Sequence, residues 1–276
     1  MARDIEAAAT LSELEGCRLV QGDVTDRSSV LKACGSSPFD AVISCHGVRP
    51  PRFSRFKDLL PGSFSKNNVD KNHPRTVNKM GVQNILAAME QTGTRKLVRI
   101  TGALVGKPNS PVAVLFNLLL SFTVKYHEAA EIAIRESGVD YLVVRPTELK
   151  DEPPARETNR VLVCLPPGSK QKLPLPGKIS IVDLAELCVA SVTNASDFPQ
   201  RTTLIVSSAE NGHKALRGGA ATVAYSFEAI GPSLAEDSDK LVKGPHRRNA
   251  LIAIATIATL LASLVSKILS LLRMIM

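Results

Sequence analysis

Residues 129–146 read AAEIAIRESGVDYLVVRP, a stretch that joins a helix pattern to a strand pattern. A helical pattern of apolar residues runs from Phe116 to Ser137, and Gly138 supplies the left-handed residue with which many helices end. Tyr141–Arg145 is then short, apolar and rich in valine, which is typical of a strand buried on both faces. A helix leading into a buried strand is the repeating unit of a parallel α/β sheet.

The same alternation continues on both sides of this stretch, across residues 1–206. Short apolar segments predict strands at Arg18–Gln21, Ala41–Cys45, Leu97–Thr101, Tyr141–Arg145 and Thr203–Val206. Helical patterns lie between them at Ser28–Cys34, Val77–Gln91, Phe116–Ser137 and Val182–Thr193. We therefore expect one α/β domain, with helices on both faces of a doubly wound parallel sheet. The apolar run Val112–Val124 is too short to span a membrane, and we expect it to be a buried helix of this domain.

The pattern changes after Val206. Residues 207–248 are small, polar and rich in glycine, which predicts a flexible linker. Residues 249–273 are apolar, with no charge from Ala250 to Ser266. About 23 residues at 1.5 Å each would cross a hydrocarbon core of about 30 Å, so a C-terminal transmembrane anchor is expected. An interfacial or oligomerising helix is the alternative. Because positive residues flank its start, we expect the domain to face the cytosol or stroma; the sequence does not indicate which membrane.

Composition narrows the function. The 276 residues carry a net charge of +8, with 4% aromatic residues and no tryptophan. Few aromatic rings argue against base stacking, and the basic residues are dispersed, so we expect solvated surfaces and no nucleic-acid partner. The five cysteines show no CxxC or metal-ligand spacing, which indicates a reducing compartment and no metal site.

Polar residues follow several of the predicted strands. Asp23 comes after the first, where it could accept from an adenine amino group or simply cap the turn. Ser44, His46 and Gly47 follow the next, and this glycine would let a ligand approach the backbone, unless the turn merely requires glycine. Thr101 could hydrogen-bond a substrate or cofactor, or a loop.

The helix before Tyr141 carries further candidates. Lys125 or His127 could face the carboxyl edge of the sheet, but at a spacing of two residues they cannot both do so. Glu128 and Glu131 are expected to face solvent, with Glu131 pairing with Arg135 at i+4.

Six motifs in order carry a family resemblance: GDVTD, AVIS, VNKMGVQNILAAM, KLVRITG, AAEIAIRESGVDYLVVRP and KISIVDLAELCVASV. This order resembles the atypical short-chain dehydrogenase/reductases, and more narrowly their NAD(P)H-binding, NmrA-like branch. The resemblance covers residues 2–206 and implies a Rossmann-like fold. Members of the family begin with a strand and a GxxGxxG turn whose backbone N–H groups hold the pyrophosphate. That segment is missing here, so the chain is expected to be truncated at its start.

The resemblance also implies cofactor-binding positions. Arg3 matches the residue that meets the 2′-phosphate of NADP, which favours NADP(H) over NAD(H). The others are Asp23 and Val24 at the adenine, Ser44, Gly47 and Thr101 along the cofactor, and Pro146 near the nicotinamide.

The active-site positions depart from the family pattern. His127 stands where the family has its lysine and Thr123 where it has its tyrosine. Threonine cannot shuttle a proton near neutral pH, whereas His127 could hold a ribose hydroxyl. Two functions follow from this departure: a membrane-tethered NADPH-dependent reductase in which Thr101 and His127 polarise a carbonyl, or a non-catalytic dinucleotide-sensing scaffold or assembly factor. The sequence does not decide whether the protein is an enzyme, and it identifies no substrate, protein partner or oligomeric state.

Overall fold

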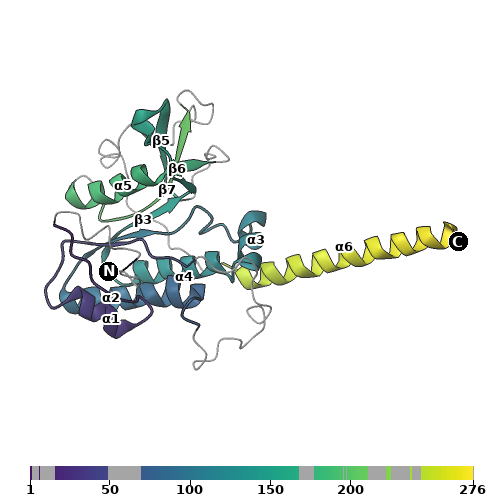
Figure 1. Ribbon diagram of the computed structural model, residues 1–276, viewed down its shortest axis with the longest axis horizontal. Coiled ribbons are helices and arrows are strands. Elements are labelled where there is room, and N and C mark those ends of the chain that lie inside the picture. The colour runs from purple at the N-terminus through teal and green to yellow at the C-terminus, as the bar shows by residue number, and fades with distance from the viewer. Residues whose placement is uncertain are drawn as a thin grey trace.

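The computed structural model describes residues 1, 6, 16–48, 70–167, 177–194, 196, 198–210, 222–224, 237 and 244–275, without the side chains of 222–224 and 264–275. These residues form a mixed β-sheet with helices on both faces, and one long helix that projects from the domain (Figure 1).

The sheet has a parallel core and an antiparallel side. Its main path runs β1-β2-β3-β7-β5-β8, and β4 and β6 pair with each other beside β7. The strands β1, β2, β3 and β7 are parallel, whereas β5 is antiparallel to both β7 and β8. The strand bounds are β1 Val42–Ser44, β2 Lys96–Ile100, β3 Asp140–Pro146, β4 Glu148–Lys150, β5 Arg160–Leu165, β6 Lys178–Ser180, β7 Arg201–Glu210 and β8 Thr222–Ala224.

Helices cover the sheet on two sides. In Figure 1, α1, α2 and α4 lie on one side of the sheet and α5 on the other. The helix bounds are α1 Arg27–Cys34, α2 Gly81–Thr92, α3 Pro111–Leu119, α4 Thr123–Glu136, α5 Ile181–Thr193 and α6 His246–Ile275. A π-helical segment, η3 Arg75–Met80, leads into α2, and a 3-10 turn, η4 Ala155–Glu157, precedes β5.

Side-chain alternation along the strands builds a separate core on each face. On β2, Leu97 packs with α2 and α4, while Val98 packs with the cluster that includes Leu187 of α5. Neighbouring residues of a strand point to opposite faces, so each strand contributes to both cores. The expected Rossmann-like α/β fold is therefore confirmed, with antiparallel strands added at one side.

Five predicted strands meet different outcomes. Those at Ala41–Cys45, Leu97–Thr101, Tyr141–Arg145 and Thr203–Val206 form β1, β2, β3 and β7. The prediction of a strand at Arg18–Gln21 was wrong, because only Gln21 makes a single bridge. Strands need a neighbouring strand to bond their backbone groups, and apolar character alone does not supply one.

The helix predicted over Phe116–Ser137 is divided into α3 and α4. Ser121 and Phe122 adopt positive φ values of 50° and 60°, which interrupt the helical path. Gly138 has a φ of 79° just after α4, as expected for a helix-ending glycine. A buried helix was expected at Val112–Val124. α3 is a helix there, but the prediction that it is buried was wrong, because Val112, Leu115 and Phe116 are exposed.

The C-terminal third contains more sheet than the sequence indicates. β7 continues to Glu210, and β8 pairs with β5 from within the predicted linker 207–248. Asp237 also contacts the domain, since its carboxylate accepts from Arg135 at 2.6 Å and from Thr203 at 2.7 Å. The rest of residues 211–243 lies outside the described residues.

The expected transmembrane anchor, residues 249–273, falls on α6. Across the part of the chain that the structure describes, no helix is long and apolar enough to pass through a bilayer, so the expected span is not supported. The side chains of residues 264–273 lie outside the described residues.

Candidate functional site

The carboxyl ends of β1, β2 and β3 place polar side chains together on the α4 face of the sheet. Ser44 ends β1 and is in register with Arg99 of β2. Thr101 follows β2, and its N–H donates to the Val144 carbonyl at 2.8 Å. Leu97, Arg99 and Thr101 alternate onto one face, so the apolar core of this face gives way to polar groups near the strand ends. In doubly wound sheets, ligands bind at this edge.

Arg99 lies at the centre of this group and is fully buried. Its Nη1 donates to Ser44 Oγ at 2.9 Å, to the Ser44 carbonyl at 3.1 Å and to the His46 carbonyl at 2.8 Å. Its Nε and Nη2 have no hydrogen-bond partner among the described residues. Burial lowers the pKa of the guanidinium to about 10, so Arg99 stays charged at neutral pH.

His46 is held as a neutral imidazole. Its Nε2 lies 3.1 Å from the Val77 carbonyl, which can only accept, so the proton is on Nε2. Its Nδ1 faces Arg99 Nη1 at 3.1 Å and Ser44 Oγ at 3.0 Å. Burial and the charge of Arg99 lower the pKa of His46 to about 3. The ring therefore orients Arg99 without adding charge.

His127 presents an unused donor. The Asn78 amide oxygen accepts from Val48 N–H at 3.3 Å, so its NH₂ group donates to His127 Nε2 at 3.1 Å. The proton of the neutral ring is then on Nδ1, which is buried and has no partner among the described residues. Burial, followed by the charge of Arg99, lowers the pKa of His127 to about 3.

Thr101 belongs to a second, closed arrangement. Its hydroxyl donates to Glu131 Oε1 at 2.7 Å. The same carboxylate accepts from Arg145 Nε at 3.1 Å and from Arg145 Nη2 at 2.5 Å, forming a bidentate ion pair with side chains 3% and 0% exposed. The hydroxyl hydrogen of Thr101 is thus directed at Glu131, and the oxygen retains lone pairs that can accept from a ligand.

These residues leave one positive charge unbalanced. Two guanidinium groups, Arg99 and Arg145, face one carboxylate, Glu131, while His46 and His127 are neutral. Burying an unpaired charge is costly unless polar groups compensate it. We call Ser44, His46, Asn78, Arg99, Thr101, His127, Glu131 and Arg145 the buried polar layer.

The remaining predicted cofactor positions have local roles as well. Asp23 Oδ1 accepts from Thr25 N–H at 2.9 Å, which caps the turn. The Val24 carbonyl accepts from Asn84 at 2.8 Å, and the Pro146 carbonyl accepts from Ala103 N–H at 3.0 Å. A Cβ placed on Gly47 would meet no atom of the described residues within 4 Å, so these residues leave the space above this backbone open. Arg3 lies outside the described residues.

Gly81, close by, allows a tight approach between elements. A Cβ there would lie 3.1 Å from His46 Nε2 and 3.1 Å from Val24 Cγ2. The start of α2 therefore packs directly against the turn after Asp23 and against the buried polar layer.

Four residues of the buried polar layer were not predicted as site residues from the sequence: Asn78, Arg99, Glu131 and Arg145. Glu131 and Glu128 are buried and not solvent-facing, and Arg135 pairs with Asp237 instead of Glu131. One signal was available, because an arginine inside the apolar strand segment KLVRI must be paired or functional when the strand is buried. The partners of Asn78 and Glu131 depend on helix rotation and are not readable from spacing.

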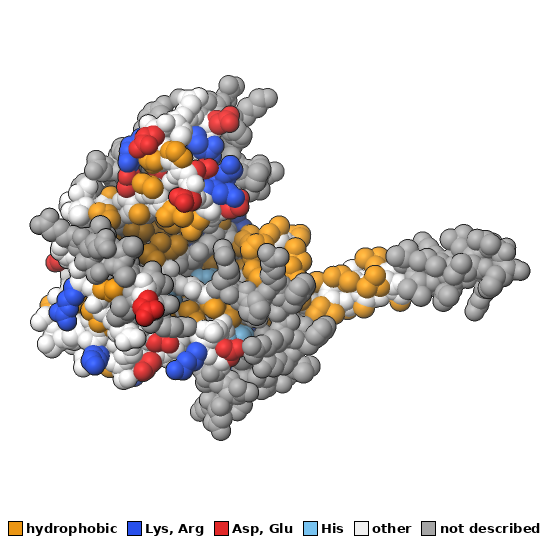
Figure 2. Space-filling view, viewed as in Figure 1, with side chains coloured by type: hydrophobic (Ala, Val, Ile, Leu, Met, Phe, Trp, Pro, Cys, Tyr) orange, Lys and Arg blue, Asp and Glu red, His pale blue; other side chains and the backbone are white. Residues whose placement is uncertain are grey.

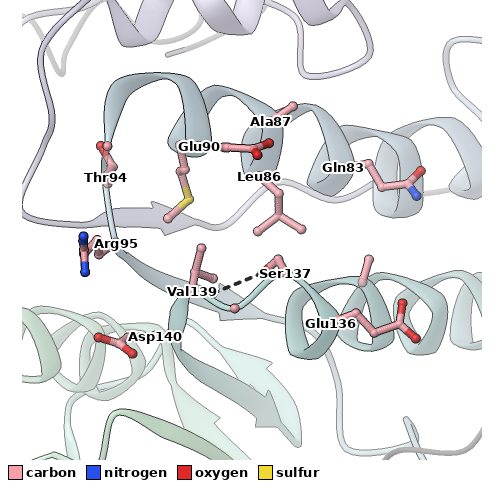
Figure 3. Close-up of a pocket in the computed structure, with 14 residues that line it drawn as sticks. Gln83, Leu86, Ala87, Glu90, Thr94, Arg95, Glu136, Ser137, Val139 and Asp140 are labelled. Atoms are coloured by element: carbon pink, nitrogen blue, oxygen red, sulfur yellow. Dashed lines mark hydrogen bonds between the residues drawn. The ribbon is translucent and has the colours of Figure 1, made fainter.

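A pocket of about 800 Å³ opens at the other end of these strands (Figure 3). It lies between the ends of α2 and α4, with Leu86 between the two helices and Glu90, Arg95, Glu136 and Asp140 among its lining. Because Arg95 and Asp140 lie at the amino ends of β2 and β3, this pocket is separate from the buried polar layer. Within the described ranges, no group of three or more His, Cys, Asp or Glu residues is placed to hold a metal ion.

A parallel sheet with helices on both faces and polar side chains at its carboxyl edge defines the Rossmann-like class of dinucleotide-binding proteins. The chain belongs to the NAD(P)H-binding family, whose model matches residues 1–195. The atypical short-chain dehydrogenase/reductase and NmrA-like resemblance of the sequence agrees with this family.

Individual proteins resemble the chain in sequence or in fold. The chain is 30% identical over 158 residues to an uncharacterised chloroplastic protein of Arabidopsis thaliana, covering 55% of this chain and 50% of the relative. The chain therefore spans half the length of that curated relative. A putative NAD-dependent epimerase/dehydratase from Bacillus halodurans has a similar fold, with a TM-score of 0.57 at 16% identity over 85% of this chain and 86% of its own. The oxidoreductase ylbE from Lactococcus lactis gives 0.51 at 15% identity, over 76% and 78%.

The residues at the carboxyl edge fit one half of such a cofactor. Among the described residues, buried N–H groups of Arg99 and His127 have no partner, and none approaches the backbone at Gly47. These features suit the oxygen-rich ribose and nicotinamide end of a dinucleotide, which offers acceptors for N–H donors.

Proposed function

We propose that the protein is an NADPH-dependent reductase of a small carbonyl compound. The observation that carries this proposal is the Nδ1–H donor of His127, which has no partner among the described residues and lies near the charge of Arg99. NADPH, when bound, supplies the hydride. His127 donates a hydrogen bond to the substrate oxygen, and the charge of Arg99 stabilises the negative charge that develops there. Because His127 is already neutral, the proton that completes the alcohol comes from water.

Thr101 contributes in a different manner. Its hydroxyl is directed at Glu131, so in this proposal it accepts a hydrogen bond from the ribose or the nicotinamide amide. Arg145 holds Glu131, and through it the orientation of Thr101. Ser44, Gly47 and Pro146 line the cofactor along the same edge, with Asp23 and Val24 toward the adenine.

NADP(H) is proposed over NAD(H). The support is Arg3, whose family counterpart meets the 2′-phosphate, together with the net charge of +8. Fluorescence titration with NADPH and NADH tests this choice, and tighter binding of NADH would contradict it.

Turnover is tested with a panel of aldehydes and ketones by following NADPH oxidation. His127→Ala should lower kcat/KM by about a hundredfold, as expected for loss of one preorganised donor. His127→Gln, which retains an N–H donor, should recover part of the rate. Lys125→Gln is the matched control on the same helix, because Lys125 Nζ lies over the Phe122 and Tyr126 rings instead. No NADPH binding by the full chain would overturn the proposal.

A second function is favoured by one observation. Thr123, at the family's tyrosine position, provides no titrating group; its hydroxyl accepts a hydrogen bond from the Asn78 amide at 3.3 Å. A dinucleotide-sensing scaffold or assembly factor would bind NADPH, and no carbonyl compound would change its affinity for NADPH. It would reduce none of these compounds. Binding without turnover would select this function.

We also infer that α6 tethers the protein to a membrane. The support is apolar exposure along its described turns, including Leu251 at 50% and Leu260 at 65%. Arg247 and Arg248 precede the apolar segment, which favours the cytosolic or stromal side for the domain. Flotation of the full chain with lipid vesicles tests this, and failure to float would contradict it.

A further inference from the structure

The helix α3 turns its apolar side chains away from the domain. Val112 and Leu115 are each 50% exposed, Phe116 is 41% exposed and Leu119 is 37% exposed. These positions follow helical spacing and form one face, whereas Ala113 and Asn117 on the opposite face are buried. α3 is thus amphipathic with its apolar face outward, the reverse of what a soluble domain requires.

This apolar face continues onto α6. The two helices are in contact, and Figure 2 shows apolar side chains gathered around the point where α6 leaves the domain. Apolar residues scattered singly over a protein surface are common. A contiguous exposed apolar surface is not, and it indicates an interaction site. We call the exposed residues of both helices the α3/α6 surface: Val112, Leu115, Phe116, Leu119, Leu251, Ile252, Ile257, Leu260 and Leu261.

Buried contacts hold the two helices in a fixed arrangement. His246, at the start of α6, has Nδ1 3.0 Å from Asn117 of α3 and Nε2 2.9 Å from Glu128 of α4. The Gly244 N–H donates to the same Glu128 carboxylate at 2.7 Å. Asn249 donates to the Pro108 carbonyl at 2.7 Å, just before α3. The base of α6 is therefore fastened to α3 and α4, and does not hang from a free linker.

Backbone strain accompanies the separation of α3 from α4. Ser121 and Phe122 both adopt left-handed φ values, a conformation that is unfavourable for residues with a Cβ. Phe122 is 1% exposed and packs with Tyr126 and with Ala250 of α6. The break in the helix at Ser121 and Phe122, together with this packing, lets α3 turn toward the base of α6. A continuous helix through this point could not make that turn.

The distribution of apolar residues favours lipid over a protein partner. At 3.6 residues per turn, Leu251, Ile252, Ile257, Leu260 and Leu261 are spread around the whole circumference of α6. A protein groove covers one face of a helix, while acyl chains surround it. Basic residues also mark the boundary, since Arg247 and Arg248 precede the apolar turns and Lys107 is exposed before α3. Their charge complements anionic headgroups.

We propose that the α3/α6 surface docks onto a bilayer containing anionic lipid, with α3 lying in the interface as a second contact beside α6. This inference rests on the proposed membrane tether. Docking of α3 orients the domain on the membrane, because α3 follows the loop after Thr101 and so belongs to the carboxyl side of the sheet. The buried polar layer is thereby held close to the bilayer surface.

The absence of tryptophan from the sequence allows a direct test. Phe116→Trp introduces a single indole on α3, and Leu119→Trp repeats the measurement one turn later. Phe39→Trp is the matched control. Phe39 is 50% exposed and lies before the amino end of β1, whereas α3 lies on the carboxyl side of the strands. The full chain is mixed with vesicles of phosphatidylcholine and phosphatidylglycerol, and separately with vesicles whose acyl chains are brominated. Flotation is measured on the same samples.

The proposal expects the indole emission of the Phe116→Trp and Leu119→Trp proteins to shift to shorter wavelength on vesicle binding. Brominated chains should quench that emission, with no change in the Phe39→Trp protein. Floating protein with an unchanged α3 signal would overturn α3 docking and leave the tether intact. Protein that does not float would overturn both. A blue shift without vesicles that grows with protein concentration would identify a second copy of the chain as the occupant, which also overturns the proposal.

Discussion

The two faces of the sheet are built from the same strands and differ in what lies near the strand ends. On the α5 face, Val98, Leu142 and Leu187 belong to an apolar cluster that extends to Val144 and Val206. On the α4 face, an apolar cluster around Leu97 is followed by the buried polar layer. The α5 face is a packing surface, whereas the α4 face accepts the cost of buried charge. Such a cost is typical of a binding or catalytic site.

The largest effect is expected from the ion pair in the buried polar layer. Glu131→Gln leaves Arg145 buried and charged without a counter-charge, so the free energy of unfolding should fall by about 3–5 kcal/mol. Urea denaturation measures the change. Glu148→Gln is the control, because its 2.6 Å ion pair with Lys150 is largely exposed and its loss should cost about 0–1 kcal/mol. Equal losses in the two variants would refute the contrast between buried and exposed charge.

A smaller loss is expected on the α5 face. Leu187 is fully buried, and Leu187→Ala should lower the free energy of unfolding by about 2–4 kcal/mol through lost burial and a cavity. Since Leu187 is on the face away from the buried polar layer, the NADPH affinity of the folded protein should not change. Val189→Ala, at a 52% exposed position of the same helix, should cost about 0.5 kcal/mol or less. Weaker NADPH binding in folded Leu187→Ala protein would show that the two faces are coupled.

The smallest expected effect is a change in the free energy of unfolding with pH. It comes from two histidines on the α4 face, His46 and His127. In the folded chain, the pKa values of His46 and His127 are lowered from 6.5 to about 3. Between these two pH values the unfolded chain therefore protonates both histidines, whereas the folded chain keeps them neutral. The stability that these two groups contribute is therefore full above about pH 6.5 and is lost as the pH falls toward 3. The free energy of unfolding should decline by about 1 kcal/mol between pH 7 and pH 6. A decline that is unchanged in a His46→Gln/His127→Gln double variant would assign it to other groups.

Local patterns predicted the parallel core well. The apolar segments around Val98 and Val143 became β2 and β3 because continuous valine and isoleucine runs fit strands buried on both faces. Asp26 caps α1 by accepting from Ser28 N–H at 3.0 Å, which is a role that aspartate commonly has just before a helix. These features depend on neighbours within a few residues.

Other predictions were wrong or missing because the features concerned depend on residues far apart in the chain. The segment at Arg18–Gln21 reads as a strand but does not form one, because strand formation depends on distant pairing partners. β5 and β8 were not predicted, although Val163 and Val223 pair in the finished sheet. Site prediction followed the same division: Thr101 and His127 were named from position, while the partners of Arg99 and Glu131 became visible only through contacts between elements.

The sequence by itself determined that this is an α/β chain with an apolar C-terminal segment, because strand and helix periodicity and helix ends are local properties. Dinucleotide binding was implied by the family resemblance of its motifs and not by that periodicity. Only the tertiary structure decided that Glu131 neutralises Arg145 instead of pairing with Arg135, that His127 Nδ1–H has no partner among the described residues, and that α3 faces outward beside α6. Each of these depends on how helices rotate against the sheet, and that rotation is set by packing between residues far apart in the chain.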